Sequence, residues 1–201
     1  MPAVKPWVFC YHVCMKTHVT FNELKWICKP KYSILNENKL ILETEPFTSL
    51  HTNGKCAEAL MPVNGNVFCM SLRVDFNYHS PLDQCGLVLY EEDGRKAVVG
   101  MEYHDGEISA LTGIVYHKDG FDRNDRDLAS GIKWMYYRIW VREDQVLLEY
   151  SFNGKRYSGF RRFSINRNHR FQIGIYACSP MESSFDCIFS ELEVMKEEEL
   201  L

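Results

Sequence analysis

Acidic residues recur between positions 102 and 107, where the sequence reads Glu-Tyr-His-Asp-Gly-Glu. Retaining glycosidases on β-sandwiches use two carboxylates from one strand face, held ~5–5.5 Å apart, as acid/base and nucleophile. Alternation along a strand places residues two positions apart on the same face. Here Asp105 and Glu107 follow Glu102 at offsets of three and five, and Asp105-Gly106 is a turn pair. The spacing therefore disfavours a glycoside hydrolase, and we assign no catalytic residue.

Cysteine and histidine residues gather near the N-terminus as Cys10, His12, Cys14 and His18. A zinc site needs four well-placed ligands, usually supplied by two short pairs, and these pairs are missing here. We therefore predict no metal and no cofactor, and we interpret residues 1–18 as an N-terminal arm or edge strand. The eight cysteines are expected to be free thiols, most of them buried in strands.

The composition indicates a soluble globular protein of 201 residues with 46% hydrophobic residues and a formal net charge of −4. This charge steers the chain toward neither nucleic acid nor an anionic membrane surface. No run approaches the ~20 apolar residues that span a bilayer, and the N-terminus is a poor signal peptide. We therefore predict a cytoplasmic protein that binds neither nucleic acid nor membranes.

Turn pairs such as Asn64-Gly65, Asp93-Gly94, Asp119-Gly120 and Asn153-Gly154 separate short alternating runs along the chain. A spacing of ~8–12 residues between turns is typical of a sandwich or barrel of many strands. Residues 117–131 are charged and have little periodicity, so we predict a long loop there, either functional or a solvated excursion. The end of the chain, 196–201, is predicted to be an acidic tail.

The hairpin over residues 134–152 has the clearest pattern. Met135, Tyr137, Ile139 and Val141 form an apolar face, which predicts the core side of a strand. A two-residue turn at Glu143-Asp144 would place Arg138 opposite Glu149 on the other face. That face is either plain exposed sheet or a sugar-type surface, since aromatic rings stack on pyranoses and charged groups bind hydroxyls. Its candidate ligand-binding residues are Trp134, Tyr136, Arg138 and Trp140.

A second hairpin covers residues 83–106 and contains Gln84 and Glu102. A two-residue turn at Asp93-Gly94 would place these side chains on opposite faces, whereas a three-residue turn at Glu92–Gly94 would pair them directly. The sequence leaves this choice open, because a one-residue slip reverses the facing. Glu102 could bind a ligand or could be a buried structural carboxylate held by arginine or backbone donors.

Three motifs resemble those of the "regulation of enolase" family. Residues 83–87 read Asp-Gln-Cys-Gly-Leu, residues 100–106 read Gly-Met-Glu-Tyr-His-Asp-Gly, and residues 176–180 read Tyr-Ala-Cys-Ser-Pro. The resemblance covers about residues 20–195. It implies an all-β fold, a two-sheet antiparallel jelly-roll sandwich of the concanavalin A-like lectin/glucanase type, over residues 19–195. It also adds Gln84, Glu102 and Ser179 as ligand-binding candidates.

Some positions depart from the family pattern. Thr-Asp-Phe-Trp is replaced by Thr48-Ser49-Leu50-His51, and Ser-Asp-Trp-Ser is replaced around Phe121-Asp122. Fold relatives of the family bind sugars, so the first hypothesis is a non-catalytic carbohydrate-binding module that uses the concave sheet. The alternative is a protein–protein interaction domain that acts on a metabolic enzyme, for example a glycolytic one. A groove over Gln84, Glu102 and Arg138 would favour the first hypothesis.

Overall fold

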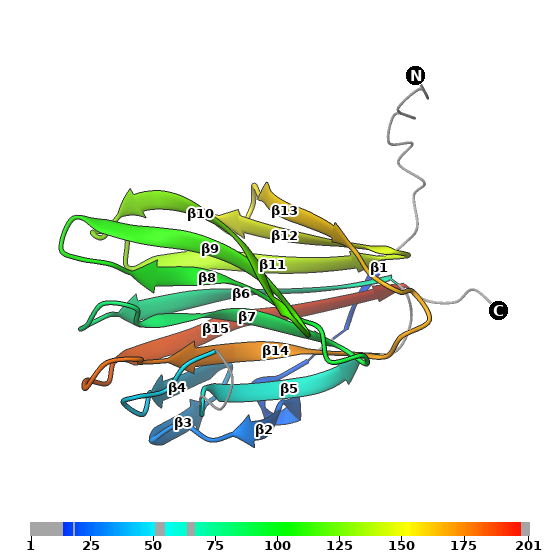
Figure 1. Cartoon of the computed structure of the whole chain (residues 1–201). Coiled ribbons are helices and arrows are strands. Elements are labelled where there is room, and N and C mark those ends of the chain that lie inside the picture. Colours follow the sequence, from blue (N-terminus) through cyan, green and yellow to red (C-terminus); the bar gives the residue numbers. More distant parts are fainter. Residues whose placement is uncertain (1–13, 18, 51–54, 64–66, 198–201) are drawn as a thin grey trace.

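Two antiparallel β-sheets pack face to face in the computed structural model, which describes residues 14–17, 19–50, 55–63 and 67–197 (Figure 1). We call them sheet A and sheet B. Sheet A has the strand order β13 (Ser158–Ser164), β12 (Gln145–Ser151), β11 (Trp134–Arg142), β6 (Val67–Asn77), β15 (Asp186–Glu197), β4 (Lys39–Glu43), β3 (Tyr32–Asn36). The short strand β1 (Cys14–Thr17) also pairs with β15.

Sheet B has the strand order β10 (Gly120–Ala129), β9 (Ile108–His117), β8 (Lys96–Tyr103), β7 (Gln84–Glu91), β14 (Phe171–Cys178), β5 (Ala57–Val63), β2 (Lys25–Cys28). A single 3₁₀ turn, η1 (Phe21–Glu23), precedes β2 within the described residues. The expected all-β jelly-roll sandwich is thus confirmed. The predicted sandwich domain therefore spans both sheets, and its core lies between them.

Side-chain alternation in the hairpin of β11 and β12 follows the predicted pattern. The four apolar side chains that start at Met135 are fully buried between the sheets. Arg138 lies opposite Glu149 and Tyr136 opposite Ser151, as a two-residue turn requires. Burial of one face of each strand is the main stabilising contribution, at ~25 cal/mol for each Å² of apolar surface removed from water.

The β7–β8 hairpin resolves the alternative that the sequence left open. Its loop has three residues, Glu92–Gly94, because Tyr90 pairs with Lys96 across it. Gly94 closes the loop with a φ of +88°, a conformation that glycine adopts without steric cost. This register pairs Gln84 directly with Glu102 on the face of sheet B that points away from the core.

The prediction of a loop over 117–131 was wrong. Ten of these residues form β10, which pairs with β9 in continuous register from Gly120 to Ala129. β10 is an edge strand, so both of its faces are largely exposed and neither needs apolar residues. Alternating Asp and Arg residues also protect an edge strand from pairing with other chains, and this composition hid the strand from periodicity arguments.

Three other segments differ from the expectation. The residue pattern predicts a strand over 47–51, but Phe47 to Leu50 form none, although Pro46 makes an isolated bridge to Ser179. β5 was not predicted, and β15 continues to Glu197, so it includes the first two residues of the predicted tail over 196–201. β1 agrees with an edge strand for part of residues 1–18. Cys10, His12 and His18 lie outside the described residues.

Six described cysteines are free thiols, and five of them are buried: Cys56, Cys69, Cys85, Cys178 and Cys187. Burial raises the pKa of the Cys56 thiol well above its usual value, and the neighbouring Cys178 adds to this effect. Burial likewise raises the pKa of Cys187, which lies beside Cys85. The thiols of Cys56 and Cys187 are therefore protonated and shielded, which makes them poor nucleophiles.

We expect the five buried thiols to react with Ellman's reagent only after unfolding. Titration of the native, reduced protein should leave at least these five unmodified, and guanidinium chloride should release them. Rapid reaction of all eight cysteines in the native protein would contradict the buried arrangement.

Candidate functional site

The seven residues predicted to bind a ligand lie in three separate places. Gln84 and Glu102 are on the outer face of sheet B, and Ser179 is in a buried turn after β14. The other four, Trp134, Tyr136, Arg138 and Trp140, are on the outer face of sheet A. The groove expected over Gln84, Glu102 and Arg138 is therefore ruled out, because two packed sheets separate Arg138 from the other two residues.

Glu102 is the centre of a charged cluster on sheet B. The side chain of Arg123 donates from Nη2 to Oε1 at 2.7 Å and from Nη1 to Oε2 at 3.2 Å. Gln84 Nε2 donates to Oε2 at 3.1 Å, and His104 Nε2 lies 3.2 Å from Oε1. Burial disfavours the charge of Arg123, but hydrogen bonds to Glu102 and Asp125 outweigh it and raise its pKa. The structural interpretation of Glu102 thus fits this geometry.

The middle of the sheet B face is covered. Val88, Val98 and Ile114 point away from the core but are almost fully buried, together with Leu50. Tyr176 lies across β8 at Gly100, where an added Cβ would come within 2.4 Å of the tyrosine hydroxyl. The chain before Leu50, which we call the covering segment, therefore passes over this face. A sugar could not reach these strands without displacing it.

Lys96 holds this covering segment in place. Its Nζ donates to the Leu50 carbonyl at 3.0 Å and lies 3.6 Å from Oε1 of Glu58. The ammonium also lies 5.5 Å from the ring centre of Tyr90 and 5.0 Å from that of Tyr116, both within cation–π range. Burial, the charge of Glu58 and a hydrogen bond to it raise the pKa of Tyr90. Lys96, Glu58 and Tyr90 thus bind one another on this part of the outer face of sheet B.

Ser179 has a structural environment. Its hydroxyl lies 2.6 Å from Oγ1 of Thr44, and its backbone N–H donates to Oγ1 of Thr48 at 2.9 Å. All three residues are buried. The Tyr-Ala-Cys-Ser-Pro motif therefore anchors the start of the covering segment to the end of β14.

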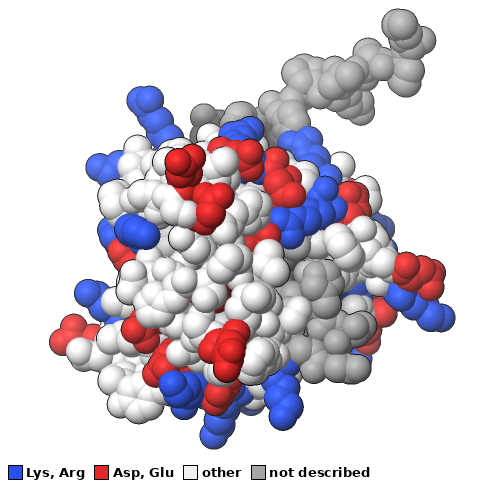
Figure 2. Space-filling view, turned by 60° about the vertical axis from the view of Figure 1, so that its left-hand side comes forward, with Lys and Arg blue, Asp and Glu red and all other residues white. Residues whose placement is uncertain are grey.

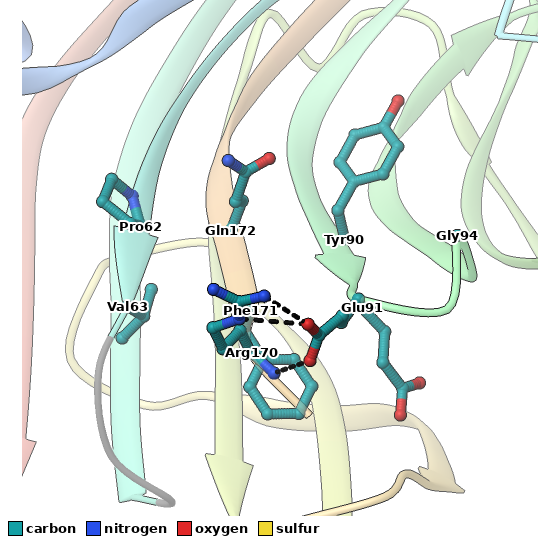
Figure 3. A pocket seen from close by; sticks show the side chains of 9 residues that line it. Pro62, Val63, Tyr90, Glu91, Gly94, Arg170, Phe171 and Gln172 are labelled. Atoms are coloured by element: carbon teal, nitrogen blue, oxygen red, sulfur yellow. Dashed lines mark hydrogen bonds and ion pairs between the residues drawn. The ribbon is translucent and has the colours of Figure 1, made fainter. Parts of the chain in front are cut away.

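A shallow pocket of about 380 Å³ opens at the hairpin end of sheet B (Figure 3). Pro62, Tyr90 and Gln172 come to it from three neighbouring strands, and Glu92 and Arg170 form an ion pair at its edge. A hydrogen bond from Arg170 lowers the pKa of Glu92. Both charges are thus already paired, which leaves few groups for a ligand.

A larger groove of about 530 Å³ lies on the outer face of sheet A. Its lining comes from the β3–β4 turn, β6 and β15: Asn38, Lys39, Arg73, Asp75, Ile188, Ser190 and Glu191. The volume is within the ~300–1,000 Å³ of small-molecule sites. Ile188 supplies an apolar surface, and the remaining side chains offer amide, ammonium, guanidinium, hydroxyl and carboxylate groups. We treat this sheet A groove as the candidate functional site.

Two predicted aromatic residues flank the sheet A groove. Trp134 lies directly across from Asp75 and is 43% exposed. The guanidinium of Arg73 is 5.5 Å from the Trp134 ring centre and 5.9 Å from that of Tyr136. Arg73 also binds Asp75 through two hydrogen bonds, of 2.8 and 2.5 Å. These contacts hold a flat ring and several planar polar groups in fixed positions beside the groove.

Glu191 enters the groove through a backbone irregularity. The register of β15 against β6 shifts between Ser190 and Glu193, and Glu191 has a φ of +52°. Bulges redirect side chains, and a non-glycine residue with positive φ is uncommon. The Tyr136 hydroxyl donates to the redirected Glu191 carboxylate at 3.1 Å. The bulge therefore joins β15 to the aromatic pair on β11.

Arg138 and Trp140 lie farther along β11. Arg138 donates to Glu149 at 2.6 Å, and its guanidinium is 3.8 Å from the ring centre of Tyr157. Partial burial raises the pKa of Tyr157 against the opposing effects of Ser71 and Arg138. Arg138 is thus held by existing partners. Trp134 and Tyr136 contact the lining residue Arg73, whereas Trp140 lies beside Arg138, away from the lining.

Sequence reasoning missed Arg73, Asp75, Lys39 and Glu191. Arg73 and Asp75 are two positions apart on a strand whose alternate residues, on the opposite face, are apolar. This pattern would have identified them as an outward pair. Glu191 carries no such signal, because a bulge cannot be read from residue types. Arg123 and Asp125 were missed because their strand was interpreted as a loop.

Basic and acidic side chains are intermixed around a mostly uncharged middle on the face in Figure 2. Such a mixed surface lacks the single-sign field that attracts polyanions. Within the described parts of the chain, no helix has the length and apolarity needed to cross a membrane.

The paired sheets and their jelly-roll strand order define a concanavalin A-like β-sandwich module. A family model matches residues 26–197, and the chain belongs to this family, described as "Protein of unknown function (DUF1349)". The resemblance noted from three sequence motifs is confirmed by this match and by a yeast relative.

That relative is "Regulation of enolase protein 1" of Saccharomyces cerevisiae, which is 23% identical over 172 residues, 83% of this chain and 86% of its own. A solved structure of a functionally unknown S. cerevisiae protein has a TM-score of 0.79 at 21% identity and covers 88% of this chain and 97% of its own. The GH43 BlXynB protein of Bacillus licheniformis has a TM-score of 0.71 at 12% identity, but the match covers only 37% of that protein. These likenesses show the fold.

The Glu102 cluster generates a stability prediction. Replacing Arg123 by Ala leaves the Glu102 carboxylate buried with fewer partners, and breaking a buried ion pair costs about 3–5 kcal/mol. Because Arg123 is a quarter exposed, we expect a loss of about 2 kcal/mol in the free energy of unfolding. Denaturant titrations followed by circular dichroism will measure it.

The matched control is the same substitution in a Glu102→Gln background, which removes the buried charge. There Arg123→Ala should cost clearly less, since no carboxylate is left unpaired. Equal costs in both backgrounds would show that the pair does not stabilise the fold in this way.

Proposed function

We propose that the protein is a non-catalytic carbohydrate-binding module whose ligand occupies the sheet A groove. The observation that carries this proposal is the exposed Trp134 ring beside the fixed Arg73–Asp75 pair at the groove. Sugar rings present apolar C–H faces that stack on aromatic side chains and hydroxyls that bind planar polar groups. The groove offers both kinds of contact in one place.

The charges of the groove favour a neutral, hydroxyl-rich sugar. Lys39 and Arg73 contribute two positive groups, and Asp75 and Glu191 contribute two negative ones. Carboxylates already oriented by Arg73 and Tyr136 would accept hydrogen bonds from sugar hydroxyls with little further ordering. An anionic sugar would meet no excess of positive charge.

The proposal places binding on sheet A, whereas a single site that joins Gln84 and Glu102 to Arg138 was expected. The latter residues bind one another and Arg123, and the chain around Leu50 covers the neighbouring strands. A non-enzymatic role agrees with the positions of the acidic residues between 102 and 107, which do not form a carboxylate pair on one strand face. Glu102 lies on β8, whereas Asp105 accepts hydrogen bonds from the backbone of its own turn. A cytoplasmic location stays a prediction from the sequence.

Trp134→Ala should weaken sugar binding about 5- to 12-fold, because loss of one stacking contact removes about 1–1.5 kcal/mol. A glycan array with the purified, reduced protein will identify ligands, and calorimetry with the strongest ligand will compare the variants. Trp140→Ala is the matched control, since Trp140 is on the same strand face but lies beside Arg138 and not beside the lining residue Arg73.

Binding that survives Trp134→Ala unchanged, or that is lost equally with Trp140→Ala, would exclude the sheet A groove as the sugar site. An array without any ligand would count against carbohydrate binding and in favour of the second candidate function.

The second candidate is a regulatory domain that binds a metabolic enzyme. It rests on the name of the yeast relative, "Regulation of enolase protein 1". We expect saturable binding of purified enolase to the immobilised protein if this candidate is right. Unchanged enolase binding by Trp134→Ala would separate the two functions, and absence of enolase binding would remove enolase as the partner.

A further inference from the structure

Exposed apolar side chains concentrate at the edge of sheet A formed by β3. Of the eleven large hydrophobic residues exposed in the described chain, three belong to the five residues of β3: Tyr32, Ile34 and Leu35. Every residue of β3 is exposed, and the sheet ends at this strand. Exposed apolar side chains on an edge strand are typical of an interface.

The other sheet ends are protected against strand pairing, whereas β3 is not. β10 alternates acidic and basic residues, β13 carries Arg161 and Arg162 next to a register shift, and β2 is short and irregular. β3 reads Tyr-Ser-Ile-Leu-Asn, without charge or proline, and pairs with β4 in regular register. Natural edges lack such protection where another strand covers them.

We propose that β3 is the interface of a homodimer, in which the β3 strands of two copies pair antiparallel about a two-fold axis. The axis passes beside Ile34, so that Ile34 faces its own counterpart. In this register Ser33 of each copy faces Leu35 of the other. The two A sheets then form one continuous sheet.

The backbone geometry of the β3–β4 hairpin supports this register. Its two-residue loop, Glu37-Asn38, makes Asn36 and Lys39 the hydrogen-bonded closing pair. Hydrogen-bonded and non-hydrogen-bonded residue pairs alternate along an antiparallel ladder. The backbone N–H and C=O groups of Ile34 therefore bind β4, and those of Ser33 and Leu35 point away from β4, toward the free edge. Two Ser33–Leu35 pairs across the axis would form about four hydrogen bonds.

Side-chain chemistry supports the same axis. Ile34 would occupy a non-hydrogen-bonded pair, the position in which cross-strand side chains approach most closely. One pair beyond the strand, Lys31 of each copy, which binds Glu43 of its own chain, would face Glu37 of the other copy. Opposite charges would thus lie near each other at two places. This self-complementarity is what a two-fold interface requires, and it favours a second copy over an unrelated partner.

The dimer would place both sheet A grooves on one side. A two-fold axis between antiparallel strands is perpendicular to the sheet, so the outer faces of both A sheets point the same way. Asn38 and Lys39 of each groove lie in the β3–β4 hairpin, close to the axis. If the proposed sugar site is right, two linked ligands could bind at once with increased avidity. The dimer itself does not depend on that function.

Light scattering after size-exclusion chromatography, over a series of concentrations, tests the proposal. We expect the full chain to have twice the mass of one copy and Ile34→Lys to be monomeric, because two ammonium groups would meet at the axis. Ile108→Lys is the matched control, with 38% exposure against 42% for Ile34, and should remain dimeric. Circular dichroism will confirm that all variants are folded.

Oxidative cross-linking tests the register independently. Ile34→Cys should form a covalent dimer on a non-reducing gel, because the facing residues are close enough for a disulfide. Ser33→Cys should not, since it would face Leu35. A monomeric wild-type protein, a dimer that survives Ile34→Lys, or equal cross-linking by both cysteine variants would overturn the proposal.

Discussion

The structure depends on the two-residue alternation of side chains in strands that have one face in the core. Each inward residue fixes the direction of its neighbours: burial of Met135 and Tyr137 forces Trp134 and Tyr136 to the outside of sheet A. A slip of one residue would expose the apolar set and bury charged groups, at a cost of several kcal/mol. In the regular strands with one face in the core, the positions of the outward polar residues therefore follow from the packing of the core.

The same constraint has a different consequence on each sheet. On sheet A, Trp134 is exposed and Arg73 and Asp75 are partly exposed beside a groove. On sheet B, the outward face is covered by the chain around Leu50, and its charged groups bind one another. Buried charges are tolerated only when paired and hydrogen-bonded, which is the condition that Glu102 and Arg123 meet. The family motifs that contain Gln84, Glu102 and Ser179 thus map to the support of the covered face.

The irregular positions are as informative as the regular ones. The bulge at Glu191 adds residues to β15 and turns a carboxylate into the groove, and the Glu92–Gly94 loop sets which residues of β7 and β8 share a face. Sheet edges obey a related rule, because an unpaired ladder attracts other strands. Charge protects β10, whereas the uncharged β3 lacks this protection.

The sequence alone determined the all-β class, the core face of β11 and β12, the Arg138–Glu149 pairing and the family resemblance. These features depend on local periodicity and on short motifs, which survive without tertiary information. The strand nature of β10 was not predictable, because an edge strand can be charged on both faces. Only the tertiary structure decided that Arg138 and Glu102 lie on opposite sheets, since strand order is set by long-range pairing that periodicity does not encode. It also decided which aromatic residues border a groove, because the neighbours of Trp134 come from strands far apart in the chain.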